Sequence, residues 1–216
     1  MYSFDELKER QRRERAEYPD NLGLRVHRSL SWLHKAETCL GDEDAQFIFL
    51  WIAFNAAYAN DVDKEYRPTQ HKMFDTFINR LCELDTNKRL ATIVWQEFPS
   101  AIRVLLNNQY VFQPFWEYKN GVIDEDTWTS RFSDAKNYAN KALGHENTAR
   151  VLGIVFTRIY TLRNQILHGG ATYNSSVNRS QIRDCTHLMG KIVPVIIEIM
   201  MDNSNTLWGD AYYPVV

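Results

Sequence analysis

The amino-acid sequence predicts an all-α fold, a bundle of amphipathic helices. Apolar residues recur at three- and four-residue spacings through long segments, which is the period of a helix with one buried face. No alternating strand pattern extends beyond a few residues, and the nine glycines and six prolines rarely interrupt the apolar periods. The chain has 216 residues, 44% hydrophobic and 24% charged, so it can bury a core without a metal or a disulfide. We expect one helical domain.

The N-terminal quarter of the chain contains a charged segment followed by two predicted helices. Residues 1–20 carry both signs of charge and few apolar side chains, so we expect a solvated helix or arm, with an RNA-binding arm as an alternative. A helix is predicted from Leu22 to Leu40, with Gly41 as its C-cap. The next, from Asp42 to Ala59, opens with an acidic turn that suits the helix dipole. It is apolar on nearly all sides (FIFLWIAFNAAY), which predicts a central helix covered by neighbours.

The middle of the chain is predicted to alternate helices with irregular segments. Residues 60–68 are expected to form a polar loop. Helical periods follow over Gln70–Leu84 and Thr86–Asn107, the second broken or kinked at Pro99. The aromatic-rich stretch Tyr110–Gly121 is predicted to be irregular and to end in an Asn-Gly turn.

Three long helices are predicted in the C-terminal part of the chain. The first covers about Asp124–Leu143, and the second covers about Asn147–His168 and stops at two consecutive glycines. A polar loop leads to the third, over about Arg179–Met201, in which Pro194 is expected to produce a kink.

Composition and charge exclude several classes of protein. With 25 Lys and Arg against 27 Asp and Glu, the net charge of −2 excludes nucleic-acid binding by bulk positive charge. The three cysteines are widely spaced, which indicates neither a disulfide framework nor a zinc knuckle. The longest apolar run, Phe47–Ala59, is too short to cross a membrane, and the charged N-terminal segment does not resemble a secretory signal. We therefore expect a cytoplasmic protein without a membrane partner.

One segment, LRNQILHGG, combines residue types that could cleave a phosphodiester without a metal. Arg163 offers a fixed fork of donors that suits a phosphate, and it stays charged at every working pH. His168 can take or give a proton near neutrality, and Asn164 adds a neutral donor and acceptor beside them. The alternative is structural, because a cation in the last helical turn also satisfies end carbonyls and the helix dipole. Glycine-rich phosphate loops, GxSxG and HExxH are absent from the sequence.

Together with the aromatic-rich helix FIFLWIAFNAAY, this segment resembles the HEPN family, and within it the ApeA-like kind. In that family an Arg, usually followed by a polar residue, and a His four to six residues later form the active site of metal-independent RNases. The matching positions here are Arg163, Asn164 and His168. The resemblance implies a HEPN-type bundle over residues 21–216 with an additional helical region at about 85–143, after the charged segment 1–20.

The resemblance also implies an activity, which is endoribonuclease cleavage by attack of the ribose 2′-hydroxyl. We expect a toxin or defence effector that acts on RNA, uses no metal or organic cofactor, and has a possible cognate antitoxin protein as a partner. His168 would be the general acid or base, Arg163 would hold the pentavalent charge, and Asn164 would orient the phosphate. The alternative is a non-catalytic module of the same fold that binds RNA, a nucleotide or a partner protein.

Five further residues are candidates for binding substrate. Asn55 is a polar residue in the apolar helix, and a purely structural hydrogen bond is an equal alternative. Tyr173 and Asn174 follow the double glycine and could line the same cleft. Phe115 and Trp116 could stack an exposed base, although packing in a core is the more ordinary role of such rings.

The spacing of Arg163 and His168 predicts a homodimer with a composite cleft. Five residues along an ideal helix correspond to roughly 7.5 Å of rise and about 140° of rotation, too much for both side chains to converge easily on one phosphate. Two copies of the helix across a two-fold axis would bring one chain's Arg163 close to the other's His168, as pairs of HEPN domains commonly do. The apolar face for this pairing is expected from the Leu152–Ile166 helix or from the final helix, at Ile192, Ile196 and Ile199.

Overall fold

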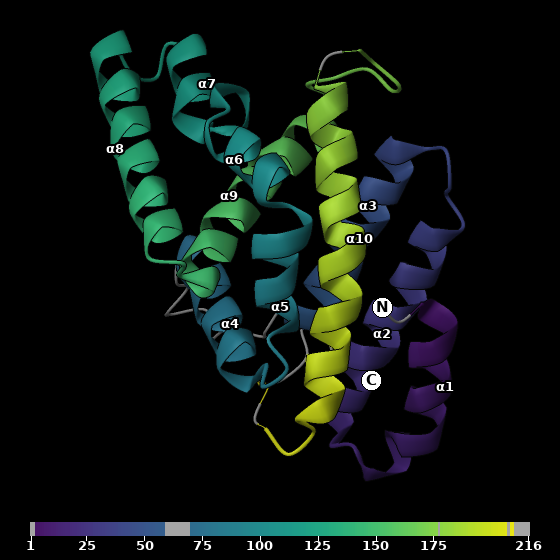
Figure 1. Cartoon of the computed structure of the whole chain (residues 1–216). Helices are drawn as coiled ribbons and strands as arrows, with labels where there is room; N and C mark the ends of the chain where they lie inside the picture. The colour runs from purple at the N-terminus through teal and green to yellow at the C-terminus, as the bar shows by residue number, and fades with distance from the viewer. Residues whose placement is uncertain (1–2, 59–69, 177, 207, 210–216) are drawn as a thin grey trace.

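The fold is all-α, as the sequence predicts. A computed structural model describes residues 3–58, 70–176, 178–206 and 208–209, and within these ranges it contains ten α-helices, short 3₁₀ and π turns, and no strand. The predicted loop at residues 60–68 lies outside the described residues. Figure 1 shows the helices arranged as a bundle, with α7 and α8 on the side opposite α1 and α2.

The centre of the bundle is formed by α2 (Asp20–Glu37), α3 (Glu43–Tyr58) and α10 (Arg179–Asp202), which pack against one another. The first two form an antiparallel pair that buried polar groups hold in register. Ser29 Oγ donates to the carbonyl oxygen of Ala53 at 2.7 Å, and Arg25 Nη1 donates to that of Ala57 at 2.8 Å. Because these groups are buried, losing either partner would leave an unsatisfied polar atom in the core.

A cluster of aromatic rings joins α3 to α4 (Gln70–Leu84) and α9 (Thr148–Leu167). Phe54 stacks on Phe156 with ring centroids 4.2 Å apart, and Trp51 lies 6.0 Å from Phe74 and 5.9 Å from Tyr160. Four of these rings are at most 2% exposed, and Tyr160 is partly exposed at the edge of the cluster. The prediction of a central helix covered by neighbours is therefore confirmed, because α3 is packed by α2, α9 and α10 and, through the ring of Phe74, by α4.

The charged N-terminal segment forms a helix, α1 (Phe4–Glu14), that packs on the bundle. Ser3 caps it with a reciprocal capping box to Glu6, and Leu7 is buried against α2. Arg10 forms an ion pair with Asp202 at the end of α10, at 2.7 Å. The sequence predicts a solvated helix or arm; the segment is a helix, but one face of it is buried on the bundle through Leu7 and Gln11 rather than solvated all round.

The region at about 85–143 consists of short helices and one long helix. Pro99 breaks the predicted Thr86–Asn107 helix, as expected. It occupies the first turn of α6, where the backbone N–H that proline lacks would have no hydrogen-bond partner within the helix. The shorter elements are α5 (Arg89–Thr92), a π turn (Ile93–Glu97), α6 (Pro99–Leu106), a 3₁₀ turn (Gln109–Val111) and α7 (Gln113–Lys119), and the long one is α8 (Glu125–Gly144).

Two boundary predictions were wrong. The stretch Tyr110–Gly121 is not irregular, since most of it forms α7, which starts with Pro114 in its first turn and packs Phe115 against Trp128 of α8 at 5.3 Å. The helix predicted to reach Leu40 ends at Glu37 instead. Leu40 is 82% exposed and belongs to the turn into α3, so no core contact extends the helix to it.

We expect Phe54→Ala to lower the free energy of unfolding by about 3–5 kcal/mol, because it removes a buried ring that contacts two other helices. Urea denaturation followed by far-UV circular dichroism measures this loss. The matched control is Phe49→Ala on the same helix, whose half-buried ring stacks on Trp32 at 5.7 Å and lies under the Lys35 ammonium at 5.6 Å, near the surface. An equal loss in the two variants would contradict the central role of the cluster.

Candidate active site

The motif LRNQILHGG forms the end of α9, and a glycine turn closes the helix. Gly169 has φ 71°, a left-handed conformation that suits glycine. Its N–H donates to the carbonyl oxygen of Ile166 at 3.2 Å, and the N–H of Gly170 donates to that of Gln165 at 2.7 Å. These two bonds are those of a Schellman motif, which satisfies the last carbonyls of the helix and leaves His168 as its C-cap.

Arg163 lies one turn before the helix end, and none of the described carboxylates pairs with it. Its Nη1 donates to Asn164 Oδ1 at 2.9 Å, and its guanidinium lies 6.0 Å from the centroid of the Tyr160 ring. Its Nε is buried and has no hydrogen-bond acceptor. No ion pair between described residues includes Arg163, whereas Arg179, sixteen positions later, binds Asp44 at 2.8 Å. The half-buried guanidinium can therefore bind an external anion without first breaking a salt bridge.

His168 is exposed, and its backbone N–H donates to the carbonyl oxygen of Asn164 at 3.0 Å. No hydrogen bond between described residues joins its imidazole to Arg163. The structure thus brings Arg163 and Asn164 into direct contact and leaves His168 apart from both side chains. An exposed imidazole one turn beyond the arginine is accessible to a ligand and to a second copy of the chain.

The face of α10 predicted as one of two alternatives for pairing two copies is buried inside the monomer, so that alternative was wrong, whereas on α9 Leu152 is buried and Ile166 is half-buried. Ile192, Ile196 and Ile199 of α10 and Leu152 of α9 are all 0% exposed, because they face the core of the bundle. Around the end of α9 the exposed apolar side chains are instead Leu167, Tyr110 and Tyr173.

Tyr173 and Asn174 contact the start of α3. The Tyr173 hydroxyl donates to Asp42 Oδ2 at 2.9 Å, and the N–H of Asn174 donates to Asp44 Oδ2 at 2.8 Å. The N–H of Ala45 and the Tyr173 hydroxyl hold the pKa of Asp42 below its usual value. These contacts anchor the loop that follows the double glycine. A role of either residue in binding substrate stays a prediction.

Asn55 is half-buried on α3, at some distance from the motif. The helices run antiparallel, since Phe54 contacts Phe156 while Trp51 contacts Tyr160. Asn55 therefore lies at the level of Phe156, which is seven residues or about 10 Å of helix from Arg163. The structure does not bring the two side chains to the same level.

Gln165 has a positioning role that the sequence analysis missed. Its Nε2 donates to the carbonyl oxygen of Tyr110, and its Oε1 accepts from Asn178 Nδ2 at 3.0 Å. The Tyr110 carbonyl also accepts from the Trp116 indole at 2.8 Å. Gln165 therefore links the helix end to the 3₁₀ turn and to the start of α10. The sequence offered no sign of this role except the position of Gln165 inside the motif, because its hydrogen-bond partners are distant in the sequence.

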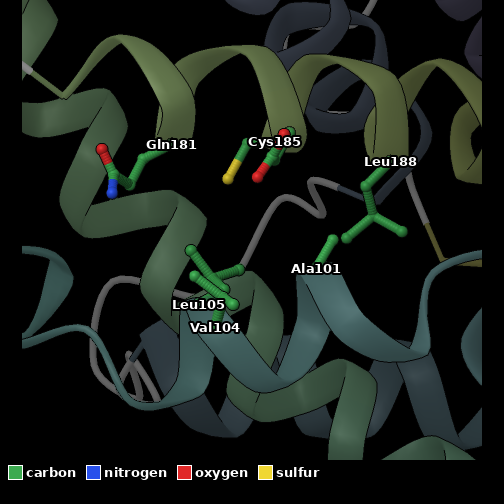
Figure 2. A pocket seen from close by; sticks show the side chains of 7 residues that line it. Ala101, Val104, Leu105, Gln181, Cys185 and Leu188 are labelled. Atoms are coloured by element: carbon green, nitrogen blue, oxygen red, sulfur yellow. The ribbon is translucent and has the colours of Figure 1, made fainter.

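The aromatic residues considered for base stacking belong to the cluster between α7 and α8. Phe115 is 6% exposed, so its ring serves packing, and Trp116 is half-buried against it at 5.2 Å. A separate shallow groove lies between α6 and α10 (Figure 2), and none of the predicted site residues lines it. Its lining is mostly apolar and consists of Ala101, Val104, Leu105, Gln181, Asp184, Cys185 and Leu188.

Among the described residues, no group of three or more His, Cys, Asp or Glu side chains is placed to hold a metal ion. Within the same ranges, no helix combines the length and apolar character needed to cross a bilayer. No protein-family model matches the chain, and neither a curated protein nor a solved structure matches it.

We expect Gly169→Ala to destabilise the protein by about 1 kcal/mol, because alanine resists the left-handed conformation that closes α9. Differential scanning calorimetry should show Tm lower by about 2–4 °C. Gly144→Ala at the end of α8 is the matched control. Gly144 does not have a positive φ, and an added Cβ there meets no atom within 4 Å, so Tm should stay unchanged or rise. Equal losses would show that the glycine turn is not what closes α9.

Proposed function

We propose that this chain is a metal-independent endoribonuclease of HEPN type that acts as a toxin or defence effector. The observation that supports the proposal most is Arg163, a half-buried guanidinium at the end of α9 that forms no ion pair with any residue the structure describes. The exposed His168 follows five residues later, on a helix end whose backbone the glycine turn holds. A free cation and a titratable imidazole are the groups that phosphodiester cleavage needs when no metal takes part.

In the proposed reaction the ribose 2′-hydroxyl attacks the adjacent phosphorus. The 2′ oxygen loses its proton and bonds to phosphorus, while the bond from phosphorus to the 5′ oxygen breaks and that oxygen gains a proton. The products are a 2′,3′-cyclic phosphate and a 5′-hydroxyl. His168 serves as the general acid or base, which contributes about 10²–10⁴ in rate. Arg163 stabilises the charge of the pentavalent phosphorus, and Asn164, which already accepts from Arg163, orients the guanidinium or the phosphate.

Arg163→Ala and His168→Ala should each reduce cleavage of single-stranded RNA by about 10²-fold or more in excess EDTA, because each removes a group that acts on the reacting atoms. Products are measured by gel electrophoresis and by detection of the terminal cyclic phosphate. Both variants should keep the helical circular dichroism spectrum and a nearly unchanged Tm.

The chain offers a matched control for each variant. His145 is an exposed C-cap of α8 with nearly the same backbone angles as His168, and Arg150 is an exposed arginine on α9. His145→Ala and Arg150→Ala should retain cleavage. Unfolding of Arg163→Ala or His168→Ala would show a structural role, and RNA binding without cleavage by the wild type would favour the non-catalytic module.

We propose further that the active unit is a homodimer, in which each cleft combines Arg163 of one chain with His168 of the other. Within one chain no hydrogen bond between the described residues joins the two side chains, and the rotation of about 140° between their positions directs them to different sides of α9. Exposed apolar residues beside them, Leu167 and Tyr110, are available for a dimer contact. A cognate antitoxin that covers this helix end would inhibit the enzyme.

A mixing experiment tests the composite cleft. After subunit exchange between inactive Arg163→Ala and His168→Ala chains, half of the dimers are mixed, and each contains one cleft with both groups intact. The mixture should therefore recover about a quarter of wild-type cleavage. The control is a mixture of either variant with a chain that carries both substitutions, which should stay inactive. Cleavage by a wild-type protein that sediments as a monomer at assay concentration would contradict the composite cleft.

A further inference from the structure

A second arginine of α9, Arg158, is buried, and the described part of the chain offers it no polar partner. Arg158 is 2% exposed, its Nε is buried without an acceptor, and no hydrogen bond or ion pair between described residues includes it. Its guanidinium carbon lies 4.3 Å from the centroid of the Phe112 ring. A ring occupies the face of a guanidinium and takes none of its five N–H donors, so the donors at the edge remain unused.

Other buried or half-buried arginines of this protein have acceptors. Arg25, which is 1% exposed, donates to the carbonyl of Ala57 at 2.8 Å, and Arg89 pairs with Asp85, Glu198 and Asp202. At Arg158, burial alone lowers the pKa to about 10, so the group still carries its charge at neutral pH. A buried charge without compensation is destabilising, which points to a function that needs it.

We propose that Arg158 holds a phosphate group of bound RNA, outside the linkage that is cleaved. The guanidinium fork matches two phosphate oxygens. Ten residues, or about 15 Å of helix, separate Arg158 from His168, so one phosphate cannot contact both. Gln165, at the same side of the helix as Arg158, lies between them and is hydrogen-bonded to Tyr110, a residue that is 47% exposed. Aromatic rings beside a cation suit a single strand, whose bases stack while its phosphates are neutralised.

Phe112 is the residue that has to move when the phosphate arrives. Its ring is half-buried and contacts Phe132 of α8 at 5.3 Å in addition to Arg158. It precedes α7 directly, in extended backbone outside any helix. A change of its side-chain rotamer would therefore uncover the face of the guanidinium that the ring now occupies, without breaking a helix. The identity of the ligand rests on the proposed function, whereas the presence of an anion site at Arg158 does not.

The test uses the full chain and a short single-stranded 2′-O-methyl RNA, which lacks the attacking hydroxyl and so reports binding independently of cleavage. Arg158→Met should bind this RNA about tenfold more weakly by fluorescence anisotropy, because it loses a charge-assisted contact. In phosphate-free buffer its Tm should be about 2–4 °C higher than that of the wild type, because an uncompensated charge is removed from the interior. Inorganic phosphate at constant ionic strength should raise the Tm of the wild type more than that of the variant.

Two more variants separate this proposal from a structural role. Arg150→Met is the matched control, since Arg150 lies on the same helix over the Tyr138 ring at 5.2 Å but is exposed, and it should bind RNA within about twofold of the wild type. Phe112→Ala should bind RNA at least as tightly as the wild type, because it removes the cover. Wild-type affinity in Arg158→Met would overturn the site, even if cleavage is confirmed. RNA binding that depends on Arg158 without any cleavage would support the site and reject the proposed function.

Discussion

The stacking of Phe54 on Phe156 is the contact on which the position of the candidate site depends. It sets the level and direction of α9 against α3, and the neighbouring contact of Trp51 with Tyr160 repeats the same register one turn further. Arg163 follows Tyr160 by three residues, so its guanidinium lies just past the end of the aromatic cluster, over the ring of Tyr160. The polar residues of the motif begin at this level, while Phe47 of α3 and Ile166 of α9 continue the apolar packing beside them.

Three arginines on or near the end of α9 show how differently the fold treats one residue type. Arg179 binds the carboxylates at the start of α3 and fixes the loop after the glycine turn. Arg163 is half-buried with one amide as its hydrogen-bond partner, and Arg158 is buried under a phenylalanine. Since opposite charges stabilise only the first, the other two keep their capacity to bind an anion from outside.

The opposite end of the bundle is held by an ion-pair network in addition to the ring contact of Trp208 with Phe77. Asp202, at the end of α10, pairs with Arg10 of α1 and with Arg89 of α5, at 2.7 and 2.8 Å. This network holds the charged N-terminal helix to the bundle, although few of its side chains are apolar. It also leaves α10 fixed at both ends, by Asp202 at one and by Arg179 at the other, which limits the freedom of the loop beside His168.

The sequence by itself determined the helices, because their apolar periods and caps are local. The all-α class, the break at Pro99, the stop at Gly169 and most helix bounds follow from residues a few positions apart. So does the candidate motif, since Arg163, Asn164 and His168 are neighbours in the chain. The short α7 was not predictable in this way, because its aromatic side chains pack on Trp128 of α8, which is distant in the sequence.

Only the tertiary structure decided which of these residues have partners. The sequence shows only that Arg158 and Arg163 are two arginines of one helix. That no described carboxylate pairs with either of them depends on which side chains the neighbouring helices place around them. The burial of Ile192, Ile196 and Ile199 could not be predicted either, because the same apolar stripe is expected whether the core of the monomer or a second chain covers it. The physical reason is common to both: charge compensation and burial arise between segments far apart in sequence, whereas helix period and capping arise within one segment.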